Sequence, residues 1–243
     1  MSSIYLVRHG QAGTRNAYDS LSELGRKQSR LLGEYFVSQG IEFVSAYAGA
    51  LLRQQQTAAE VSAAYSDAGI SFPEVVVEAG WNEFDFHQIY RELAPLLCEE
   101  DAEFRREYEV MRAEIEASAG AHDAEVHRRW GPSDTKVVEA WACGRYPHGG
   151  ETWEQFRERV AACRLKLHEA ERDANIVVFT SATPAAILTG LSLGILDDHV
   201  RRLAGVLRNT SFTVLRIGRE QDWRLLSFNE VPHLNRLELR TRR

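Results

Sequence analysis

Short apolar runs alternate with amphipathic stretches over roughly the first 80 residues of the chain. Residues 4–7, 43–48 and 74–77 are rich in strand formers, which predicts three β-strands. Between them, residues 24–40 and 51–65 place apolar side chains at helical spacing, and Ser20 with Glu23 forms a capping-box pattern before the first helix. This β-α-β-α-β order indicates a mainly parallel sheet with helices on both faces.

The middle of the chain has a different pattern. Residues 87–142 carry alternating charges and strong helix formers, and they contain no convincing strand. We expect a solvated helical insertion, or cap, within a single domain that spans residues 1–243. His122 and His127 lie in this insertion five residues apart, which places them on different faces of a helix and argues against a shared metal ion.

The sheet pattern returns after the insertion. Thr152 and Gln155 form a second capping-box pattern, which opens a helix expected to reach residue 172, and residues 175–180 are the most strand-like segment of all. Thr183 suits the N-cap and Pro184 the first position of the next helix. Residues 211–217 and 223–228 predict two last strands. The expected fold is therefore a three-layer α/β/α sandwich with a mainly parallel central sheet and the helical insertion.

Composition narrows the class of protein. Hydrophobic residues make up 44% of the chain and charged residues 26%, which is typical of a folded globular protein and excludes a mainly disordered one. The formal net charge of −6 disfavours nucleic acid as a partner. No apolar stretch is long enough to cross a membrane, and the first residues show no signal-peptide pattern, so we expect a cytoplasmic protein.

The cysteines and the basic C-terminal segment predict no special function. Cys98, Cys143 and Cys163 are odd in number and widely spaced, so neither a disulfide framework nor a zinc site is indicated. Residues 236–243 are basic, and we expect a frayed tail there. We expect no metal and no cofactor, and the sequence carries no signal for an oligomeric state.

Residues with useful chemistry follow each of the four strands that are expected to run parallel. Ligands of open α/β sheets bind beyond the carboxyl ends of such strands, which meet at one edge. The groups that would converge there are Arg8, His9, Arg53, Glu83 and residues 181–183. Two guanidinium groups and a helix N-terminus favour an anion, above all a phosphoryl group. An imidazole beside them can act as a nucleophile and a carboxylate as an acid or base.

Each of these residues also has a purely structural interpretation. A histidine after a strand is more often a hydrogen-bonded structural residue. Arg53 could be a surface charge of its helix, and Glu83 could do no more than pair with an arginine. Because four separate strand ends agree, their joint placement favours a functional site.

Motifs along nearly the whole chain, apart from the helical insertion, resemble those of the histidine phosphatase superfamily, which includes the phosphoglycerate mutases. Leu6-Val-Arg-His-Gly-Gln-Ala12 resembles the R-H-G signature of that family. Residues 51–58 resemble its L-x-R-x-x-Q-T-A helix. Further similar segments are residues 21–28, 82–83, 149–152 and 159–160.

The resemblance implies a phosphatase. In the family the signature histidine attacks phosphorus and becomes phosphohistidine, a role that falls on His9. The phosphate-clamping arginines fall on Arg8 and Arg53, and the proton donor on Glu83. Gln11, beside the signature, is expected to bind the same phosphate. The substrate would be a phosphate ester of a small molecule or a protein, and the insertion at 87–142 is expected to select it.

The chain departs from the family pattern after the fourth strand. The family carries a second histidine there, in a segment like S-H-G-G, and Ser181 takes its position. A serine donates one neutral hydrogen bond, and the loss of one transition-state donor typically costs about 10²–10³ in rate. We therefore expect a slow phosphatase, a compensated site or, as the alternative, a non-catalytic phosphate-binding or regulatory module.

Several groups could compensate for the missing histidine. The backbone N–H groups of Ala182 and Thr183 are expected to point at the anion from the start of a helix. His148 precedes a Gly-Gly pair and could supply a cation, and His87 could line the mouth of the site. An exposed surface position is the alternative for both histidines.

A second departure concerns mutase activity. The mutase signature has a serine and an asparagine at the places of Ala12 and Arg15. This difference favours hydrolysis over mutase chemistry.

Overall fold

The computed structural model describes residues 2–13, 19–118, 132–167, 173–218 and 222–242. The chain forms two compact units, one made of Met1–Gly13, Ala17–Glu83 and Arg159–Arg242, the other centred on Phe84–Glu158. The strands are β1 Ser2–Arg8, β2 Ser45–Ala48, β3 Val75–Val77, β4 Asn175–Thr180, β5 Phe212–Ile217 and β6 Trp223–Glu230. The α-helices are α1 Glu23–Ser38, α2 Leu52–Asp67, α3 Phe86–Glu100, α4 Ala102–Ala117, α5 Pro132–Ala142, α6 Trp153–Leu167, α7 Ala182–Leu193 and α8 Asp197–Val206, with short 3₁₀ turns η2 Ala79–Trp81 and η5 Leu237–Leu239.

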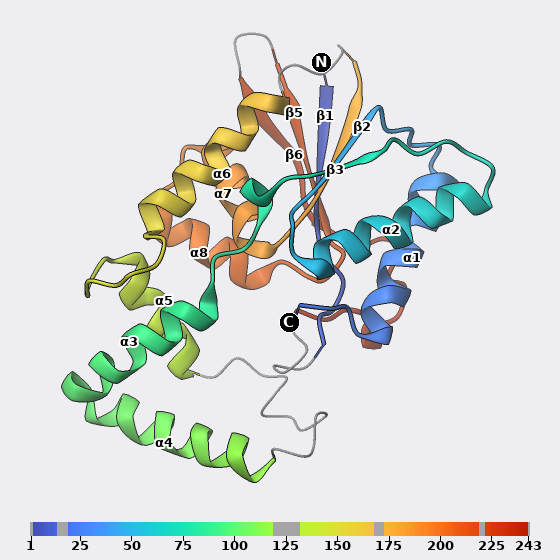
Figure 1. Ribbon diagram of the computed structural model, residues 1–243. Coiled ribbons are helices and arrows are strands. Elements are labelled where there is room, and N and C mark those ends of the chain that lie inside the picture. Colours follow the sequence, from blue (N-terminus) through green and yellow to red (C-terminus); the bar gives the residue numbers. More distant parts are fainter. Residues whose placement is uncertain (1, 14–18, 119–131, 168–172, 219–221, 243) are drawn as a thin grey trace. The chain divides into compact units, whose positions relative to one another are not determined.

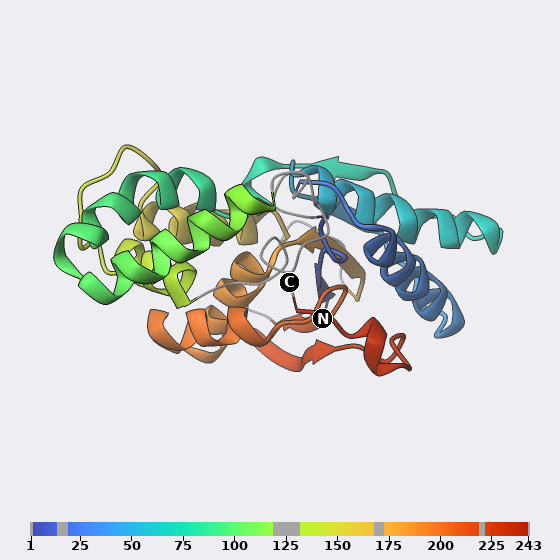
Figure 2. The same cartoon turned by 90° about the horizontal axis from the view of Figure 1, so that it is seen from below.

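The first unit is built on a six-stranded sheet with the order β3-β2-β4-β1-β5-β6. β3, β2, β4 and β1 are parallel neighbours, and β5 runs antiparallel between β1 and β6. Helices α1 and α2 cover one face of this sheet, while α7 and α8 lie on the other (Figures 1 and 2). The predicted α/β fold with a mainly parallel sheet is confirmed.

The register of the four parallel strands brings their carboxyl ends to one level. Arg8 at the end of β1 pairs with Thr180 at the end of β4. Ala48 at the end of β2 pairs with Phe179 on one side and Val77 on the other. Segments that follow these four strands therefore start at the same edge, as the strand-end rule requires.

The core between the sheet and helices α1 and α2 is aromatic. Phe36 packs edge-on against Phe43 and Phe212, each with ring centroids 5.3 Å apart. Phe36 is fully buried, and so is Val7 of β1 in the same cluster. Burial of one such side chain contributes about 1.5–3 kcal/mol, so this core fixes β1 against α1 and gives the following loop a rigid base.

Three helix starts test the predicted caps. At α6 the predicted box is present, because Gln155 N–H donates to Thr152 Oγ1 (3.2 Å) and Thr152 N–H to Gln155 Oε1 (2.9 Å). The box predicted at Ser20 is wrong, since Ser22 is the N-cap of α1 and accepts from Gly25 N–H (3.0 Å). The cap predicted at Thr183 is wrong too: α7 begins at Ala182, with Ser181 as N-cap.

In the part of the second unit that the structure describes, the regular elements are all helices (α3, α4, α5 and the start of α6), as expected for residues 87–142. Its core is an aromatic cluster in which Phe84 and Trp141 lie 4.6 Å apart and Trp141 meets Trp153 edge-on at 5.5 Å. Trp141 is nearly fully buried, and its Nε1 donates to the Glu151 carbonyl (2.9 Å). His122 and His127 lie outside the described residues, and the placement of 87–142 as an insertion within a single domain stays a prediction.

The C-terminal segment is not the frayed tail that its charge suggested. Gln28 Nε2 donates to the Leu239 carbonyl (2.7 Å) and to Thr241 Oγ1 (2.9 Å), and Thr241 Oγ1 donates to Asn209 Oδ1 (2.8 Å). Gln28 and Asn209 are fully buried. These bonds satisfy buried amides that would otherwise be costly, and they dock the segment on the first unit. Among the described helices of either unit, none is both long and apolar enough to cross a membrane.

Candidate active site

The loop that leaves β1 carries a buried histidine. His9 is 3% exposed, and its backbone N–H donates to the Thr180 carbonyl at the end of β4 (2.9 Å). Gly10 follows because there is no room for a side chain: a Cβ there would lie 2.4 Å from the Gly25 carbonyl oxygen. The start of α1 therefore presses directly on this loop, and His9 is held in place from both sides.

The protonation state of His9 follows from its contacts. Its Nδ1 lies 2.7 Å from the Gly10 carbonyl oxygen, which can only accept, so Nδ1 carries the proton. Arg53 Nε, which can only donate, lies 3.2 Å from His9 Nε2, so Nε2 carries the lone pair. Burial, then the charges of Arg53 and Arg8, hold the pKa of His9 well below its usual range, against the opposing effect of the Gly10 carbonyl. The ring is neutral at ordinary pH.

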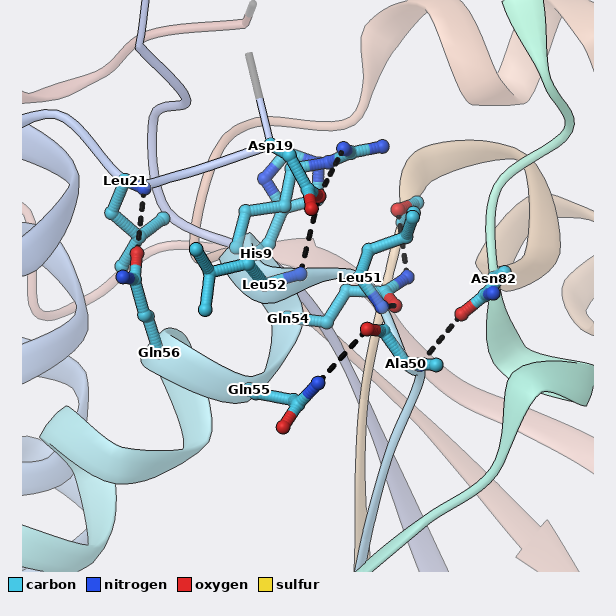
Figure 3. A network of polar contacts seen from close by, with 12 residues as sticks. His9, Asp19, Leu21, Ala50, Leu51, Leu52, Gln54, Gln55, Gln56 and Asn82 are labelled. Carbon is cyan, nitrogen blue, oxygen red and sulfur yellow. Dashed lines mark hydrogen bonds and ion pairs between the residues drawn. The ribbon is translucent and has the colours of Figure 1, made fainter. Parts of the chain in front are cut away.

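Arg53 reaches this histidine from the first turn of α2. It is 6% exposed, and its Nη1 pairs with Asp19 Oδ1 (3.2 Å), which also accepts from Leu52 N–H (3.1 Å). Figure 3 shows the contact of the Asp19 carboxylate with Leu52 at the start of α2. Arg53 is thus an inward-facing residue and not the surface charge of its helix that the structural interpretation allowed.

Arg8 supplies the second buried guanidinium group. It is 6% exposed, and its Nη1 donates to the carbonyl oxygens of Leu207 and Arg242 (the latter at 3.1 Å). These carbonyl oxygens orient the guanidinium group. The two guanidinium groups bring hydrogen-bond donors to the neutral imidazole, a combination suited to a phosphoryl anion.

The acid/base candidate follows η2. Glu83 Oε2 accepts from the Thr183 N–H at the start of α7 (3.2 Å). The sequence predicted that this N–H points at the anion; in the structure it binds the Glu83 carboxylate. Arg159 Nη1 fastens the segment through the carbonyls of Ala79 (3.2 Å), Gly80 (2.8 Å) and Asn82 (3.3 Å). Asn82 Oδ1 in turn accepts from Ala50 N–H (2.6 Å; Figure 3).

Ser181 stands directly after β4, and Ala182 opens α7 behind it. Ser181 is 1% exposed, and its Oγ accepts from Gln54 Nε2 (2.9 Å). The same nitrogen donates to the Trp81 carbonyl (3.1 Å), which also accepts from Thr180 Oγ1 (2.7 Å). The serine therefore belongs to a neutral hydrogen-bond network, in contrast to the charged surroundings of His9.

Gln11 is fixed at the rim of the same loop. Its N–H donates to Gln28 Oε1 (2.9 Å), and Ser22 Oγ donates to its Oε1 (2.9 Å). Below the loop, the His9 carbonyl accepts from Thr210 N–H (3.2 Å). Thr210 Oγ1 bonds His233 Nε2 (2.9 Å), and burial lowers the pKa of His233 to about 3. These contacts support the loop from the rear.

His148 and His87 belong to the second unit. His148 Nδ1 accepts from Gly150 N–H (3.1 Å), and Gly149 N–H donates to Glu92 Oε2 (2.7 Å), which lowers the pKa of Glu92. His87 is exposed near the start of α3. The roles predicted for these two histidines stay predictions.

Three residues that build the site have no role predicted from the sequence: Asp19, Gln54 and Arg159, which fastens the segment that carries Glu83. Gln54 had a detectable signal, because it shares the helical face of Thr57, Ala58 and Val61, all buried. A polar residue on such a face needs a specific partner. Asp19 lies in a loop, where spacing gives no information.

Comparisons with known proteins agree with these observations. Residues 4–139 and 115–231 match the model of the histidine phosphatase superfamily (branch 1). A search of the curated proteins found no significant match. Among solved structures, the chain resembles Bacillus stearothermophilus YhfR (TM-score 0.64, 15% identity, 96% of this chain and 100% of that one).

Two further solved structures have similar folds. One is the phosphoserine phosphatase of Entamoeba histolytica in complex with 3-phosphoglyceric acid (TM-score 0.60, 16% identity, 96% of this chain and 100% of that one). The other is a mycobacterial glucosyl-3-phosphoglycerate phosphatase (TM-score 0.56, 19% identity, 93% and 98%). At these identities the likeness shows a shared fold.

Proposed function

Because the chain belongs to branch 1 of the histidine phosphatase superfamily, we propose that it hydrolyses phosphomonoesters through a phosphohistidine intermediate on His9. The state of the His9 ring supports this most directly. Nδ1 donates to the Gly10 carbonyl, the pKa is held well below its usual range, and Nε2 keeps its lone pair. Only an unprotonated nitrogen can form a bond to phosphorus, so the ring is ready to attack.

In the first step the phosphoryl group of the substrate enters beside His9. Arg53 keeps its proton but redirects its Nε–H hydrogen bond from His9 Nε2 to a nonbridging oxygen, which frees the lone pair, and Arg8 balances the remaining negative charge. Nε2 attacks phosphorus and the ester P–O bond breaks. Glu83, as a carboxylic acid, gives its proton to the leaving oxygen, so the alcohol departs neutral.

In the second step water hydrolyses the phosphohistidine. Glu83, now a carboxylate, takes one proton from the water as its oxygen attacks phosphorus, and the N–P bond breaks. Inorganic phosphate leaves and His9 returns to its neutral state. The net reaction is an ester plus water giving an alcohol plus phosphate.

The remaining binding roles follow from position. Gln11, Ser181 and the Ala182 N–H lie where segments leave β1 and β4, and we assign them to the phosphate, while Thr183 N–H holds Glu83. We keep His148 as a candidate for the outer part of the substrate. We also propose a cytoplasmic location, since Cys98, Cys143 and Cys163 are all free.

We propose small phosphomonoesters as the first substrates to test, with hydrolysis favoured over mutase chemistry. The similar structures include a phosphoserine phosphatase and a glucosyl-3-phosphoglycerate phosphatase. The helical unit would select among such esters, since lids and insertions carry selectivity in enzymes of this kind.

The alternative function is a phosphate-binding or regulatory module without turnover. Ser181 favours it, because a neutral hydroxyl replaces the charged second histidine of the family. His9 and Glu83 favour the enzyme, because a binder needs neither a nucleophile nor a proton donor.

Hydrolysis of 4-nitrophenyl phosphate between about pH 5 and 8 tests the proposal. We expect turnover that disappears in His9→Ala and survives in the control His199→Ala, an exposed histidine of α8. When a brief reaction with the substrate is stopped in base, we expect one phosphoryl group bound to each native protein molecule and none bound to the His9→Ala variant.

Turnover that persists in His9→Ala would refute the nucleophile. Phosphate binding without turnover would establish the module instead.

A further inference from the structure

A fully buried glutamine links Ser181 to the segment that carries Glu83. Gln54 uses all the hydrogen-bonding groups of its amide: Nε2 donates to Ser181 Oγ (2.9 Å) and to the Trp81 carbonyl (3.1 Å), and Oε1 accepts from Leu51 N–H (3.3 Å). Its side chain fills the space above Gly49, where a Cβ would lie 1.9 Å from Gln54 Oε1. A buried amide with every group satisfied has a fixed orientation.

This orientation decides what the Ser181 hydroxyl can do. A hydroxyl accepts through its oxygen and donates its one proton. Because both hydrogens of the Gln54 amide point at acceptors, Ser181 Oγ must accept from Gln54 and cannot donate to it. In the described residues Ser181 makes no other side-chain hydrogen bond. The Ser181 proton is therefore available for an acceptor outside the protein.

The acceptor that fits is the phosphoryl group at His9. Ser181 follows Thr180 directly, and His9 N–H bonds the Thr180 carbonyl, so the two side chains start from adjacent strands at the same level. We propose that Gln54 is a positioning residue, which holds the Ser181 hydroxyl as a neutral donor to a nonbridging oxygen of the bound phosphoryl group. This rests on the proposed phosphate site and names how it works without a second histidine.

A consequence concerns space. The Gln54 amide lies against Ser181 Oγ, so an imidazole at position 181 would collide with it. A shorter residue at position 54 would leave room for the family histidine. We expect Ser181→His alone to lower activity, and Ser181→His combined with Gln54→Ala to recover it.

A double-mutant cycle tests the coupling of Gln54 to Ser181. Gln54→Met keeps the size of the side chain and removes the amide. We expect it to lower kcat/KM for 4-nitrophenyl phosphate and weaken the calorimetric affinity for inorganic phosphate, each about tenfold. In a Ser181→Ala background the same change should have less than about a twofold effect, because there is no hydroxyl left to orient.

The controls separate positioning from folding. Gln55→Met, one residue along α2, removes an amide that donates to the Ala50 carbonyl (2.9 Å) and should leave both quantities unchanged. Thermal unfolding shows which variants fold. If Gln54→Met does not fold, Gln54→Asn takes its place, because the shorter side chain withdraws the amide from Ser181 by one methylene. We expect the same losses from this variant.

Each outcome decides the matter. Equal losses from Gln54→Met with and without the Ser181 hydroxyl would make Gln54 merely structural and overturn the proposal. If the native chain binds phosphate without turnover, the proposed function fails while the affinities still decide the role of Gln54. If it neither binds phosphate nor turns over, both proposals fail.

Discussion

The ends of β1 and β4 lie side by side, but their buried polar groups have opposite surroundings, charged at β1 and neutral at β4. After β1, Arg8 and His9 are buried with their charge and lone pair held by carbonyl oxygens and by Arg53. After β4, Ser181 is equally buried, and its hydroxyl accepts from the neutral amide of Gln54. One strand end carries guanidinium groups and an imidazole, and its neighbour carries an uncharged hydroxyl.

This difference shows where a phosphate site can lose charge. Under the proposed function the β1 end needs its cations, because they would stabilise the anion and because, after burial, their charges lower the pKa of His9. In our proposal the β4 end contributes a neutral donor, so its orientation matters more than its charge. Orientation comes from a residue on another helix, so the two ends are expected to respond differently to substitution.

The largest expected effect is the loss of a cation. Arg53→Met should lower kcat for 4-nitrophenyl phosphate about 10³-fold, because it removes charge-assisted bonds to the phosphoryl group. Ser181→Ala, which removes one neutral donor, should lower it by about 10²-fold or less. Steady-state kinetics on both variants measures the ratio.

Arg26→Met is the matched control, since the side chain of Arg26 is 48% exposed and pairs with Glu60. A larger loss in Ser181→Ala than in Arg53→Met would reverse the comparison between the two strand ends.

A second effect is the titration of His9. A protonated ring has no lone pair, so activity that depends on it is lost as the pH falls through its pKa, and a lowered pKa moves that loss to more acid pH. We expect the ¹⁵N shifts of the His9 ring, assigned with His9→Ala, to show no midpoint near 6.5. In Arg53→Met the midpoint should rise, because the Arg53 charge is the second cause of the lowering. A midpoint near 6.5 in the native chain would contradict the statement that burial and the two arginine charges lower the pKa of His9.

The smallest expected effect is the contribution of His233 to the pH dependence of the free energy of unfolding. Burial lowers the pKa of His233 to about 3, whereas an unfolded histidine titrates near 6.5. Between these values the unfolded chain binds a proton that the folded chain does not. The free energy of unfolding therefore falls as the pH falls, by at most about 1.4 kcal/mol per pH unit from this residue. Urea unfolding of His233→Gln at pH 6.5, 5.5 and 4.5 should show a flatter dependence, and an unchanged slope would place His233 elsewhere than behind Thr210.

The sequence predicted the fold well because strands and helices follow from periodicity. The run at 175–180 became β4 without a shift of either bound. The strand-end rule also brought His9, Arg53, Glu83 and Ser181 to one edge, since parallel strands must end together.

Helix starts were predicted less well. Ser20 and Ser22 are chemically equivalent caps, and the choice depends on which hydroxyl meets Gly25 N–H. The C-terminal segment was misjudged from its charge, because its attachment runs through backbone carbonyls, which every sequence has.

The long reach of these attachments bears on how the protein is made. Gln28 bonds Leu239 across 211 positions of the chain, and Arg8 bonds Arg242 across 234. During synthesis β1 leaves the ribosome long before β4 and β5 exist to pair with it, so its apolar side chains wait uncovered. Contacts between such distant residues form slowly, because a long loop must close first. The site around His9 is therefore among the last parts of the nascent molecule to be completed.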